Sequence, residues 1–283
     1  MVFQPRSHRQ GQAWLWLLVL LALVVGAVWL FAIQRRWWFP PLASEQGAHI
    51  DRLFLIILSL TGATFVLGQL ALALLIFLFG RKGAESAHHL RERAGWGTLW
   101  PILIGFGLIG ALEVSDVVIG HELWKQLYGP PPEDVFVVEV TAQQFAWNVR
   151  YPGRDGKFGR TNLRFVSDGN PLGIDPEDSA ARDDVVLLNE IHLPLHRPVV
   201  VRVRSKDVIH SFFIPAFRLK QDAVPGMQTQ IWFIPKRAGE FEIACAELCG
   251  LGHYRMRGML TVEGEESLRA WLEQQVPFGE TIW

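Results

Sequence analysis

Three long, nearly uncharged apolar runs near the N-terminus constrain this 283-residue chain most: residues 14–33, 53–79 and 99 to about 119. The first two reach the roughly 20 residues that an α-helix needs to cross a bilayer. The third contains Glu113 and Asp116, so either it ends near Leu112 or these carboxylates face protein or the interface rather than lipid. Half of all residues are apolar and 12 are tryptophan, more than an average soluble domain carries. The sequence therefore predicts a membrane protein.

Basic residues set the expected topology. The segment between the second and third runs contains four of them, which favours a cytoplasmic location and places the C-terminal half outside: Arg81, Lys82, Arg91 and Arg93. The first run is longer than the roughly 7–15 apolar residues of a signal peptide and has no clean cleavage site. We favour a retained third helix, and a cleaved signal remains the alternative.

From about Glu133 onward, short alternating stretches such as VFVVEVTA and VVVRVRS replace the apolar runs. They predict strands over 135–141, 145–151, 185–192, 199–205, 228–235, 239–244 and 259–263. Many short strands separated by turns are typical of a Greek-key sandwich or barrel. The spacing of SLRAWLEQQV predicts a C-terminal helix. The expected fold is an α+β membrane protein with a helical hairpin, an extra helix and an all-β domain.

These patterns divide the chain into five expected segments. They are an N-terminal tail with the first apolar helix (1–39), a transmembrane hairpin (40–120), a Pro-rich linker (121–133), a β domain (134–265) and a C-terminal helix (266–283). We find no internal repeat, no glycine-rich phosphate loop and no basic patch for nucleic acid. The sequence therefore predicts no nucleic-acid partner.

Both cysteines of the chain lie in CAELCGLGHYRM, followed closely by a histidine and a methionine. A disulfide between Cys245 and Cys249 is one interpretation, but it would close a very short loop and leave His253 and Met256 unexplained. Two buried structural thiols are another, and Met256 alone is more often a core residue than a ligand. Against these stands a metal site, because two thiolates, an imidazole and a thioether form a soft donor set that selects copper. A structural zinc site would instead use four strong ligands.

A second imidazole lies upstream, since His210 in DVIHSFFIPAF follows a predicted strand. A histidine at a strand end, combined with a later Cys–His–Met loop, is the ligand layout of cupredoxins. The all-β domain is therefore expected to be cupredoxin-like, with one cysteine more than a single blue-copper centre needs.

The segments KDVIHSFFIPAFRLKQDAVPG and CAELCGLGHYRMRG resemble subunit II of haem–copper cytochrome c oxidase over about residues 45–265. The resemblance implies a dinuclear copper site, CuA, with Cys245 and Cys249 bridging the coppers. One copper would also take His253 and the main-chain carbonyl of Glu247, and the other His210 and Met256. It also implies that the Glu247 side chain reaches magnesium at the boundary with subunit I.

The chain departs from the family where electrons enter. The usual aromatic run after a glutamine is here TAQQFAWNVRY, so Phe145 follows Gln144 in place of tryptophan, and Trp147 is kept. This variant resembles bacterial oxidases that take electrons from a membrane-linked cytochrome, such as one attached to alternative complex III.

The stretch 151–184 is rich in Gly, Pro and Asp, and we expect a surface loop. A solvated loop is the favoured interpretation of its acidic end, and a docking surface for a basic cytochrome competes with it. The residues for such docking are Asp207, Asp175, Glu177, Asp178, Asp183 and Asp184. Five further histidines fit no ligand pattern and are expected at the surface: His88, His89, His121, His192 and His196.

The resemblance implies a subunit that takes single electrons from cytochrome c at CuA and passes them to haem in subunit I, where oxygen is reduced to water. This chain itself holds no haem and no oxygen-reducing residues. The implied partners are subunits I and III, a soluble or membrane-linked cytochrome c and membrane lipid. The expected location is a bacterial inner membrane, crossed more than once, with the CuA domain on the periplasmic face. The alternatives are a quinol oxidase subunit, a CuA domain serving nitric oxide reduction and a copper-delivery protein.

Overall fold

The computed structural model describes residues 19, 21–31, 39–79 and 99–280. Residues Leu21–Phe31 form a short apolar helix, and they belong to a compact unit, 1–42, that is separate from 43–283. The topology prediction rests on the basic segment 81–93, which lies outside the described residues, as do His88 and His89.

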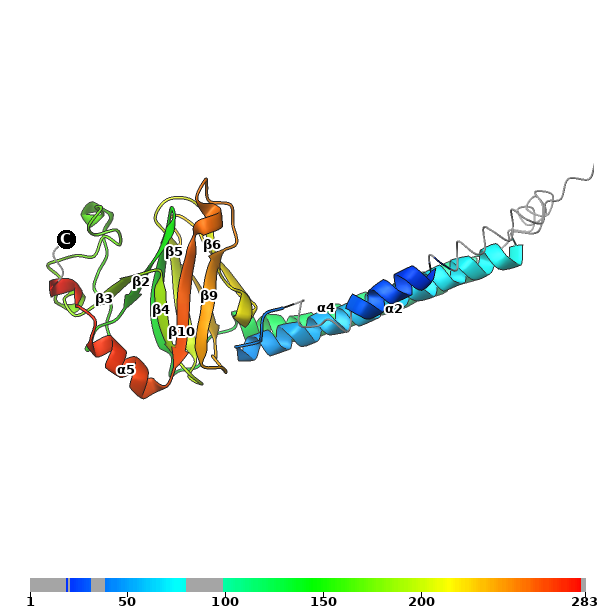
Figure 1. Cartoon of the computed structure of the whole chain (residues 1–283), viewed down its shortest axis with the longest axis horizontal. Helices are drawn as coiled ribbons and strands as arrows, with labels where there is room; N and C mark the ends of the chain where they lie inside the picture. Colours follow the sequence, from blue (N-terminus) through cyan, green and yellow to red (C-terminus); the bar gives the residue numbers. More distant parts are fainter. Residues whose placement is uncertain (1–18, 20, 32–38, 80–98, 281–283) are drawn as a thin grey trace, which may run out of the picture. The chain divides into compact units, whose positions relative to one another are not determined.

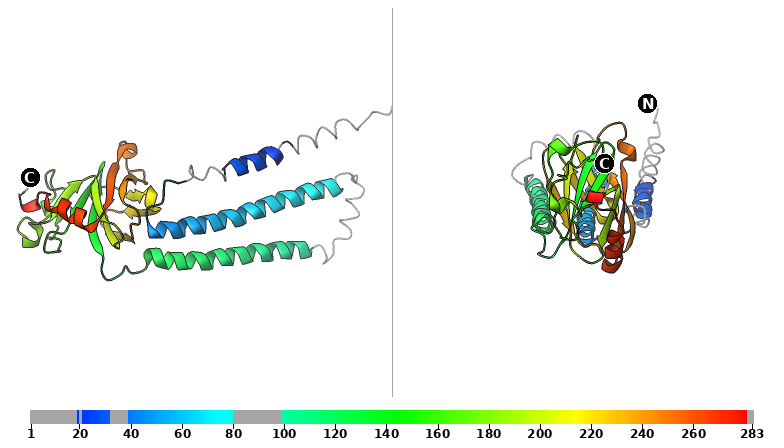
Figure 2. Two further views of the ribbon diagram at one scale, coloured as in Figure 1. Left: turned by 60° about the horizontal axis from the view of Figure 1, so that its bottom comes forward. Right: turned by 90° about the vertical axis from the view of Figure 1, so that its left-hand side faces the viewer.

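Two long helices, α2 (Glu45–Phe79) and α4 (Leu99–Tyr128), follow the predicted apolar runs. By length and composition both could cross a membrane, and the rest of the described chain does not cover their apolar stretches. The two helices contact each other (Figure 2). Ser44 caps α2, because its Oγ accepts a hydrogen bond of 2.9 Å from the amide of Gly47. The helical hairpin of the prediction is therefore present as two apolar helices.

Helix α4 is longer than the sequence suggested. It runs through HELWKQLY, which was predicted as the start of a linker, and ends at Tyr128, with one glycine before three consecutive prolines. Proline cannot continue a helix because it lacks the amide hydrogen and clashes with the preceding turn. Glu113 and Asp116 thus lie inside the helix and do not mark its end.

The remainder forms two five-stranded sheets (Figure 1). Their orders are β3-β2-β1-β5-β8 and β4-β10-β9-β6-β7. The strand bounds are β1 (Phe136–Gln143), β2 (Ala146–Tyr151), β3 (Val185–Leu188), β4 (Glu190–Pro194), β5 (Val199–Ser205), β6 (His210–Ile214), β7 (Leu219–Ala223), β8 (Thr229–Phe233), β9 (Gly239–Cys245) and β10 (Arg257–Glu263). Alternate side chains from both sheets, such as Val138, Val140 and Ile243, fill one apolar core. The predicted β-sandwich is confirmed.

The run 185–192, predicted as one strand, is divided by Asn189 into β3 and β4, which belong to different sheets. Asn189 has a positive φ of 59°, and its side chain accepts a hydrogen bond from the amide of Trp147. Asparagine tolerates this left-handed conformation better than most residues. The chain therefore crosses between the sheets at this residue.

Strands β6 and β7 were missed by the pattern analysis. β7 reads LKQDA, which is too polar for a typical strand, yet it pairs with β6 from Leu219 to Ala223. The C-terminal helix α5 (Glu265–Glu273) was predicted, although it begins slightly earlier than SLRAWLEQQV suggested. Its first turn carries Glu265 and Glu266, which suit the positive end of the helix dipole.

The start of α2 is bonded to the sandwich near η5 (Pro215–Phe217). The Oγ of Ser44 donates to the carbonyl of Phe217 at 2.7 Å. The guanidinium of Arg218 donates twice to the carboxylate of Asp51, at 2.9 and 3.1 Å. A paired guanidinium–carboxylate contact fixes direction as well as distance.

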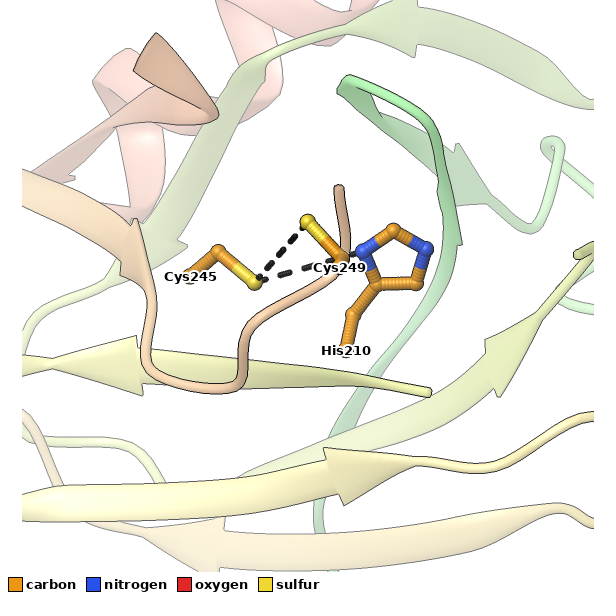
Figure 3. A group of neighbouring side chains, drawn as sticks. All are labelled: His210, Cys245 and Cys249. Atoms are coloured by element: carbon orange, nitrogen blue, oxygen red, sulfur yellow. Dashed lines mark hydrogen bonds between the residues drawn. The ribbon is translucent and has the colours of Figure 1, made fainter. Parts of the chain in front are cut away.

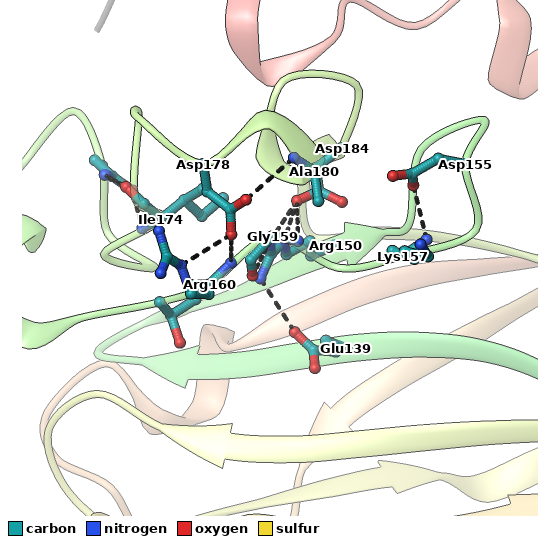
Figure 4. Close-up of polar contacts among 12 residues, drawn as sticks. Glu139, Arg150, Asp155, Lys157, Gly159, Arg160, Ile174, Asp178, Ala180 and Asp184 are labelled. Atoms are coloured by element: carbon teal, nitrogen blue, oxygen red, sulfur yellow. Dashed lines mark hydrogen bonds and ion pairs between the residues drawn. The ribbon is translucent and has the colours of Figure 1, made fainter.

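The stretch between β2 and β3, residues 152–184, is hereafter called the excursion. It contains the short helices η3 (Leu163–Phe165) and η4 (Ser179–Ala181), and Ile174 and Ala181 form a small second core with Phe278 of η7 (Phe278–Glu280). Arg150 at its base is almost fully buried and bonds Asp184 and the carbonyl of Gly159 (Figure 4). The excursion is thus tied to the sheet by internal polar contacts.

Candidate metal centre

The cysteine loop leaves the end of β9 and returns to the start of β10. The amide of Cys245 donates to the carbonyl of Met256 at 3.2 Å, which closes the loop at its base. The amide of Ala246 donates to the carbonyl of Ser211 at 3.0 Å, which holds the loop against β6. Because β6 begins at His210, this pairing brings His210 beside Cys245 although they are far apart in sequence (Figure 3).

The side chains of the loop converge on a small volume. The Sγ atoms of Cys245 and Cys249 lie 3.8 Å apart, so the two thiols are free and form no disulfide. The Sγ of Cys249 lies 3.7 Å from Nδ1 of His253 and 3.8 Å from Sδ of Met256. The Sγ of Cys245 lies 4.0 Å from Nδ1 of His210 and 3.1 Å from the carbonyl oxygen of Glu247.

These separations can be compared with what one metal ion allows. Nitrogen and sulfur donors bind at about 2.0–2.3 Å, so two donors on one ion lie at most about 4.6 Å apart. All of the separations given above between neighbouring donors are within that limit, the longest being 4.0 Å. The donor atoms of His210, Cys245 and Cys249 also all lie within 4.8 Å of one another. The residues therefore fit a metal centre made of soft donors.

A carboxylate orients the buried imidazole of His210. Nε2 of His210 lies 2.7 Å from Oδ1 of Asp207, which leaves Nδ1 facing the sulfur of Cys245. The backbone amides of Gln144 and Val208 also donate to Asp207, each at 2.7 Å. An acceptor on the far nitrogen favours the tautomer whose near nitrogen is free to bind a metal. Asp207, predicted as a docking residue, thus lies behind His210.

The environment changes the acidity of two of these groups. Burial, and then the neighbouring Cys245, raise the pKa of the Cys249 thiol to about 11. For Asp207, burial acts to raise the pKa, but hydrogen bonds from His210 and two backbone amides outweigh it and hold the pKa below its ordinary value. The Asp207 carboxylate is therefore charged at neutral pH, while Cys249 keeps its proton until a cation displaces it.

Two glycines of CGLGH let the aromatic residue Phe145 approach the loop. A Cβ at Gly252 would lie 2.4 Å from the Phe145 ring, and Gly250 has a φ of 132°, where other residues are strained. The side-chain amide of Gln144 donates to the carbonyl of Cys249 at 2.5 Å. Sequence reasoning did not use these glycines, although their spacing within CGLGH was visible.

The residues predicted for the point where electrons enter lie beside the site at different depths. Gln144 is exposed and Phe145 is half-buried. Trp147 is fully buried, and its ring packs edge-on against His210 with centroids 6.3 Å apart. Trp147 therefore lies next to a candidate ligand and not on the surface that a donor would touch.

The acids predicted for donor docking lie mostly in contacts within the excursion. Asp175 and Asp178 both pair with Arg160, at 3.3 and 3.2 Å, and Asp184 is buried against Arg150. Asp183 accepts a weak hydrogen bond of 3.3 Å from the amide of Asp155, and Glu177 is exposed without an ion pair among the described residues. Much of this negative charge is thus balanced inside the loop.

The expectation that His192 lies at the surface is wrong. It is 8% exposed, stacks on Trp271 at 3.6 Å, and places Nδ1 and Nε2 at 2.6 and 3.0 Å from Glu263 and Glu190. The α5 helix supplies Trp271 and covers the histidine, which a strand pattern alone cannot reveal. Both ring nitrogens already have carboxylate partners, so His192 belongs to a structural cluster.

Comparison with known proteins agrees with this geometry. The family described as "Cytochrome C oxidase subunit II, periplasmic domain" matches residues 136–262. The chain is 39% identical to the alternative cytochrome c oxidase subunit 2 of Bradyrhizobium diazoefficiens, over 92% of each chain. It is 32% identical to cytochrome c oxidase subunit 2 of Cereibacter sphaeroides, over 83% of this chain and 79% of the relative.

Among solved structures, the periplasmic domain of subunit II of a Bradyrhizobium japonicum cytochrome oxidase is similar, with 30% identity. The match covers 52% of this chain and 96% of that domain, with a TM-score of 0.39. The family match identifies the β-sandwich as the cupredoxin-like periplasmic domain of subunit II. The chain belongs to the cytochrome c oxidase subunit 2 family, and is accordingly a subunit of a haem–copper oxidase, an oxidoreductase complex.

Proposed function

We propose that this chain is the electron-transfer subunit of a respiratory oxidase, receiving single electrons from a cytochrome c and delivering them to haem in subunit I. Oxygen would be reduced to water there and not in this chain. The observation that carries the proposal is the convergence of two thiols, two imidazoles and a thioether within metal-binding reach. Family membership supports the same reading and counts against the copper-delivery alternative.

The proposed ligand set is the one that the family resemblance implies. Cys245 and Cys249 would bridge two coppers, His253 and the carbonyl of Glu247 would complete one, and His210 and Met256 the other. The close approach of Cys245 to the Glu247 carbonyl, 3.1 Å, supports that main-chain role. When bound, the dinuclear copper centre supplies one-electron redox chemistry.

The chain's own residues prepare that site before the metal arrives. Asp207 orients His210, and the Gln144 side chain pins the carbonyl of Cys249. Met256 and Cys249 are almost fully buried, which keeps water from their sulfur atoms. A site held by packed strands changes shape little when it gains or loses an electron, which favours fast transfer.

The chain would contact other subunits and the membrane. The Glu247 side chain is exposed, which leaves it available to bind magnesium at a boundary with subunit I. Helices α2 and α4 would cross the bacterial inner membrane against subunit I, with subunit III also in the complex. The sandwich would then face the periplasm, as the matching periplasmic family domain suggests.

Electron paramagnetic resonance on the full chain, purified in detergent and loaded with copper, tests the ligand assignment. We expect hyperfine structure from one unpaired electron shared by two copper nuclei, and two coppers per chain by metal analysis. A single-copper spectrum from folded protein would mean that the assignment is wrong.

Substitutions identify the ligands. Met256→Leu should alter the spectrum because Met256 is buried against Cys249, whereas Met227→Leu, at an exposed methionine, should leave it unchanged. Likewise His210→Gln should abolish the two-copper pattern, and His196→Gln should not. Equal effects of the test and control substitutions would point to general misfolding in place of ligand loss.

A further inference from the structure

A cleft of about 880 Å³ lies between the excursion and the outer face of the sheet that contains β1 and β5. On β1, Glu139 and Thr141 alternate with buried core residues and therefore point outward into it. The other walls are the stretch 161–172 of the excursion and the turn 225–228 between β7 and β8. We call it the excursion cleft. Its volume is typical of pockets that hold small molecules, and no proposed copper ligand lines it.

The wall that the excursion supplies is fixed by its own hydrogen bonds. The amide of Asn162 donates to the carbonyl of Gly173 at 2.7 Å. The buried side chain of Asn170 accepts from the amide of Ile174 at 3.0 Å and donates to the carbonyl of Ile174 at 2.8 Å. A wall that is already ordered loses little conformational entropy when a ligand binds.

Arg204 of β5 is half-buried in the cleft and contacts all three walls. Its Nε donates to the side-chain carbonyl of Gln228 at 2.8 Å, Nη2 bonds the same oxygen, and Nη1 lies 3.4 Å from the hydroxyl of Thr161. Lys206, two residues later, lies 3.5 Å from the side-chain carbonyl of Gln143. These partners are all neutral. Within the described ranges, neither cation forms an ion pair with a carboxylate.

The carboxylates near the cleft do not neutralise these two cations. Glu139 lines the cleft, but its oxygens lie 3.4 Å from Arg150 and 3.7 Å from Arg202 (Figure 4). Asp207 is close in sequence but does not line the cleft, and its oxygens accept hydrogen bonds from an imidazole and two backbone amides. Asp168, on the turn of the excursion wall, is exposed and does not line the cleft either. The lining therefore carries an excess of positive charge.

Much of the remaining lining is apolar. Two large apolar side chains at the cleft are open to water, Leu163 at 90% and Met227 at 58% exposure. Four further apolar residues line it: Val166, Pro171, Leu172 and Pro225. Covering such surface with an apolar group is favourable. The cleft thus offers a positive region beside an apolar one.

We propose that the excursion cleft binds a small organic anion, with its carboxylate or phosphate group against Arg204 and Lys206 and its apolar body against Leu163 and Met227. The guanidinium fork matches both head groups, and the lysine adds a second positive charge. The ligand would contact no copper ligand, so this inference goes beyond the proposed function and does not depend on it. It gives the excursion a role as one wall of a binding site, as is common for long surface loops.

Isothermal titration calorimetry tests the cleft with the copper-free full chain in detergent, after subtraction of the heat that each probe gives with detergent alone. The probes are naphthoate and naphthyl phosphate. We expect at least one to bind saturably at one site per chain, and the tighter probe identifies the preferred head group. Uncharged naphthol should bind at least about tenfold more weakly, because it lacks the ionic contact. Equal binding of naphthol would mean that the cleft does not select anions and would overturn the inference.

Substitutions locate the binding site. Arg204→Gln should weaken the anion by at least about tenfold, and Arg204→Lys should restore part of the affinity, because it keeps the charge without the fork. Leu163→Ser should weaken it by about fivefold. Arg269→Gln on α5 removes an exposed cation that does not line the cleft, and should leave the affinity unchanged.

A second charge variant keeps the test valid if Arg204→Gln unfolds the chain. Lys206 is exposed and has one long hydrogen bond, so Lys206→Gln should fold normally and weaken the anion by about threefold. If neither probe bound the native chain, or if the folded charge variants bound as tightly as the native chain, the inference would be wrong. Either result would leave the copper proposal intact, since the two-copper spectrum is measured separately.

Discussion

The sandwich contains two buried polar clusters that satisfy their polar groups in opposite ways. Under the excursion, Arg150 is surrounded by Asp184, Glu139 and the carbonyl of Gly159, so its charge is balanced within the chain. In the cysteine loop, sulfur and nitrogen donors face one another at 3.7–4.0 Å without an opposite charge between them. The first cluster is complete in charge, because Arg150 has carboxylate partners within the chain, whereas the second is incomplete, since its donor atoms could still hold a metal ion.

The difference also appears in the acidity of the buried groups. Burial raises the pKa of Asp184 in spite of its contacts with Arg150. Among the described residues, Oδ1 of Asp184 has no hydrogen-bond partner, while Oδ2 accepts several hydrogen bonds. Burial likewise raises the pKa of Cys249, but there the neighbouring group is a second thiol and not a cation. Burial alone therefore does not identify a functional site. A group of buried metal-binding atoms that has no opposite charge beside it does identify one.

The largest expected effect is on the complete cluster. Asp184→Ala leaves the buried Arg150 guanidinium with the Gly159 carbonyl and only a longer ion pair, to Glu139, and should lower the free energy of unfolding by about 3–5 kcal/mol. Urea unfolding of the copper-free chain in detergent, with hydrogen exchange at the amides of β2, measures this loss. The exposed cation Arg160 provides the comparison, since Arg160→Ala should cost less than about 1 kcal/mol.

A double substitution tests whether the loss of stability comes from an unbalanced buried charge. Arg150→Met together with Asp184→Leu removes both charges and should recover most of the stability lost in Asp184→Ala. If the double variant were no more stable than the single one, the ion pair would matter through its geometry and not through charge balance.

Copper loading tests the incomplete cluster. Copper held at about 100 times its dissociation constant should raise the free energy of unfolding by about 2.7 kcal/mol, because only the folded chain gathers the ligands. Calorimetry with and without copper measures the shift, and Cys249→Ser should remove it. Asp184→Ala should keep the copper-induced increment although its baseline is lower; loss of the increment there would mean that the two clusters are coupled.

A smaller effect is expected where Phe145 meets the loop. Gly252→Ala puts a methyl group 2.4 Å from the Phe145 ring and should cost about 1–3 kcal/mol by overpacking. The copper spectrum should change in parallel, because the ring or the loop must move. Gly62→Ala in α2, where a Cβ meets nothing within 4 Å, is the matched control and should neither lower the stability nor change the spectrum.

The smallest effect concerns Asp222. It contacts Ser211, the residue whose carbonyl holds the cysteine loop against β6. The hydrogen bond of 2.7 Å from the buried Ser211 hydroxyl, together with Lys220, holds the pKa of Asp222 below its ordinary value. The contribution of the Asp222 carboxylate to folding stability is therefore fully present above the pKa of an unfolded aspartate, about 3.9. It is lost as the pH falls through the lower pKa that Asp222 has in the folded chain. Because the carboxylate is nearly half exposed, Asp222→Asn should lose less than about 1 kcal/mol at pH 6, and nothing once pH is below the folded pKa. Urea midpoints across this pH range check the sign.

The sequence was most informative where a pattern repeats. Apolar runs predicted α2 and α4, and alternation predicted most strands, because both depend on burial that recurs along the element. The end of α4 was expected too early, although the prolines that stop it follow it closely, and the polar strand β7 was not predicted because its pairing with β6 decides it. A soft metal site could be proposed from the motif, because clustering a chain's two cysteines beside histidine and methionine has few structural explanations, while the full ligand set is what the family resemblance implies.

Other features required three-dimensional contacts. Arg150 lies in the strand sequence AWNVRY and gave no hint of burial against Asp184, which is far along the chain. His192 was assigned to the surface because nothing local indicates that Trp271 of α5 stacks on it. Asp207 was predicted as a docking residue. Its hydrogen bond to His210 could not be predicted, because it depends on the turn before β6. Each of these depends on pairing between segments that the sequence does not place together.

The way the excursion is joined to the sheet has a consequence for how such a chain can change over generations. Its two ends are the antiparallel partners β2 and β3, so they meet whatever the length of the segment between them. The entropy of closing such a loop grows only slowly, by about 0.6 kcal/mol for each doubling of length. The excursion can therefore be shortened, lengthened or replaced, provided that Arg150 is replaced at the same time. The ligands on β6 and β9 keep their positions in each case.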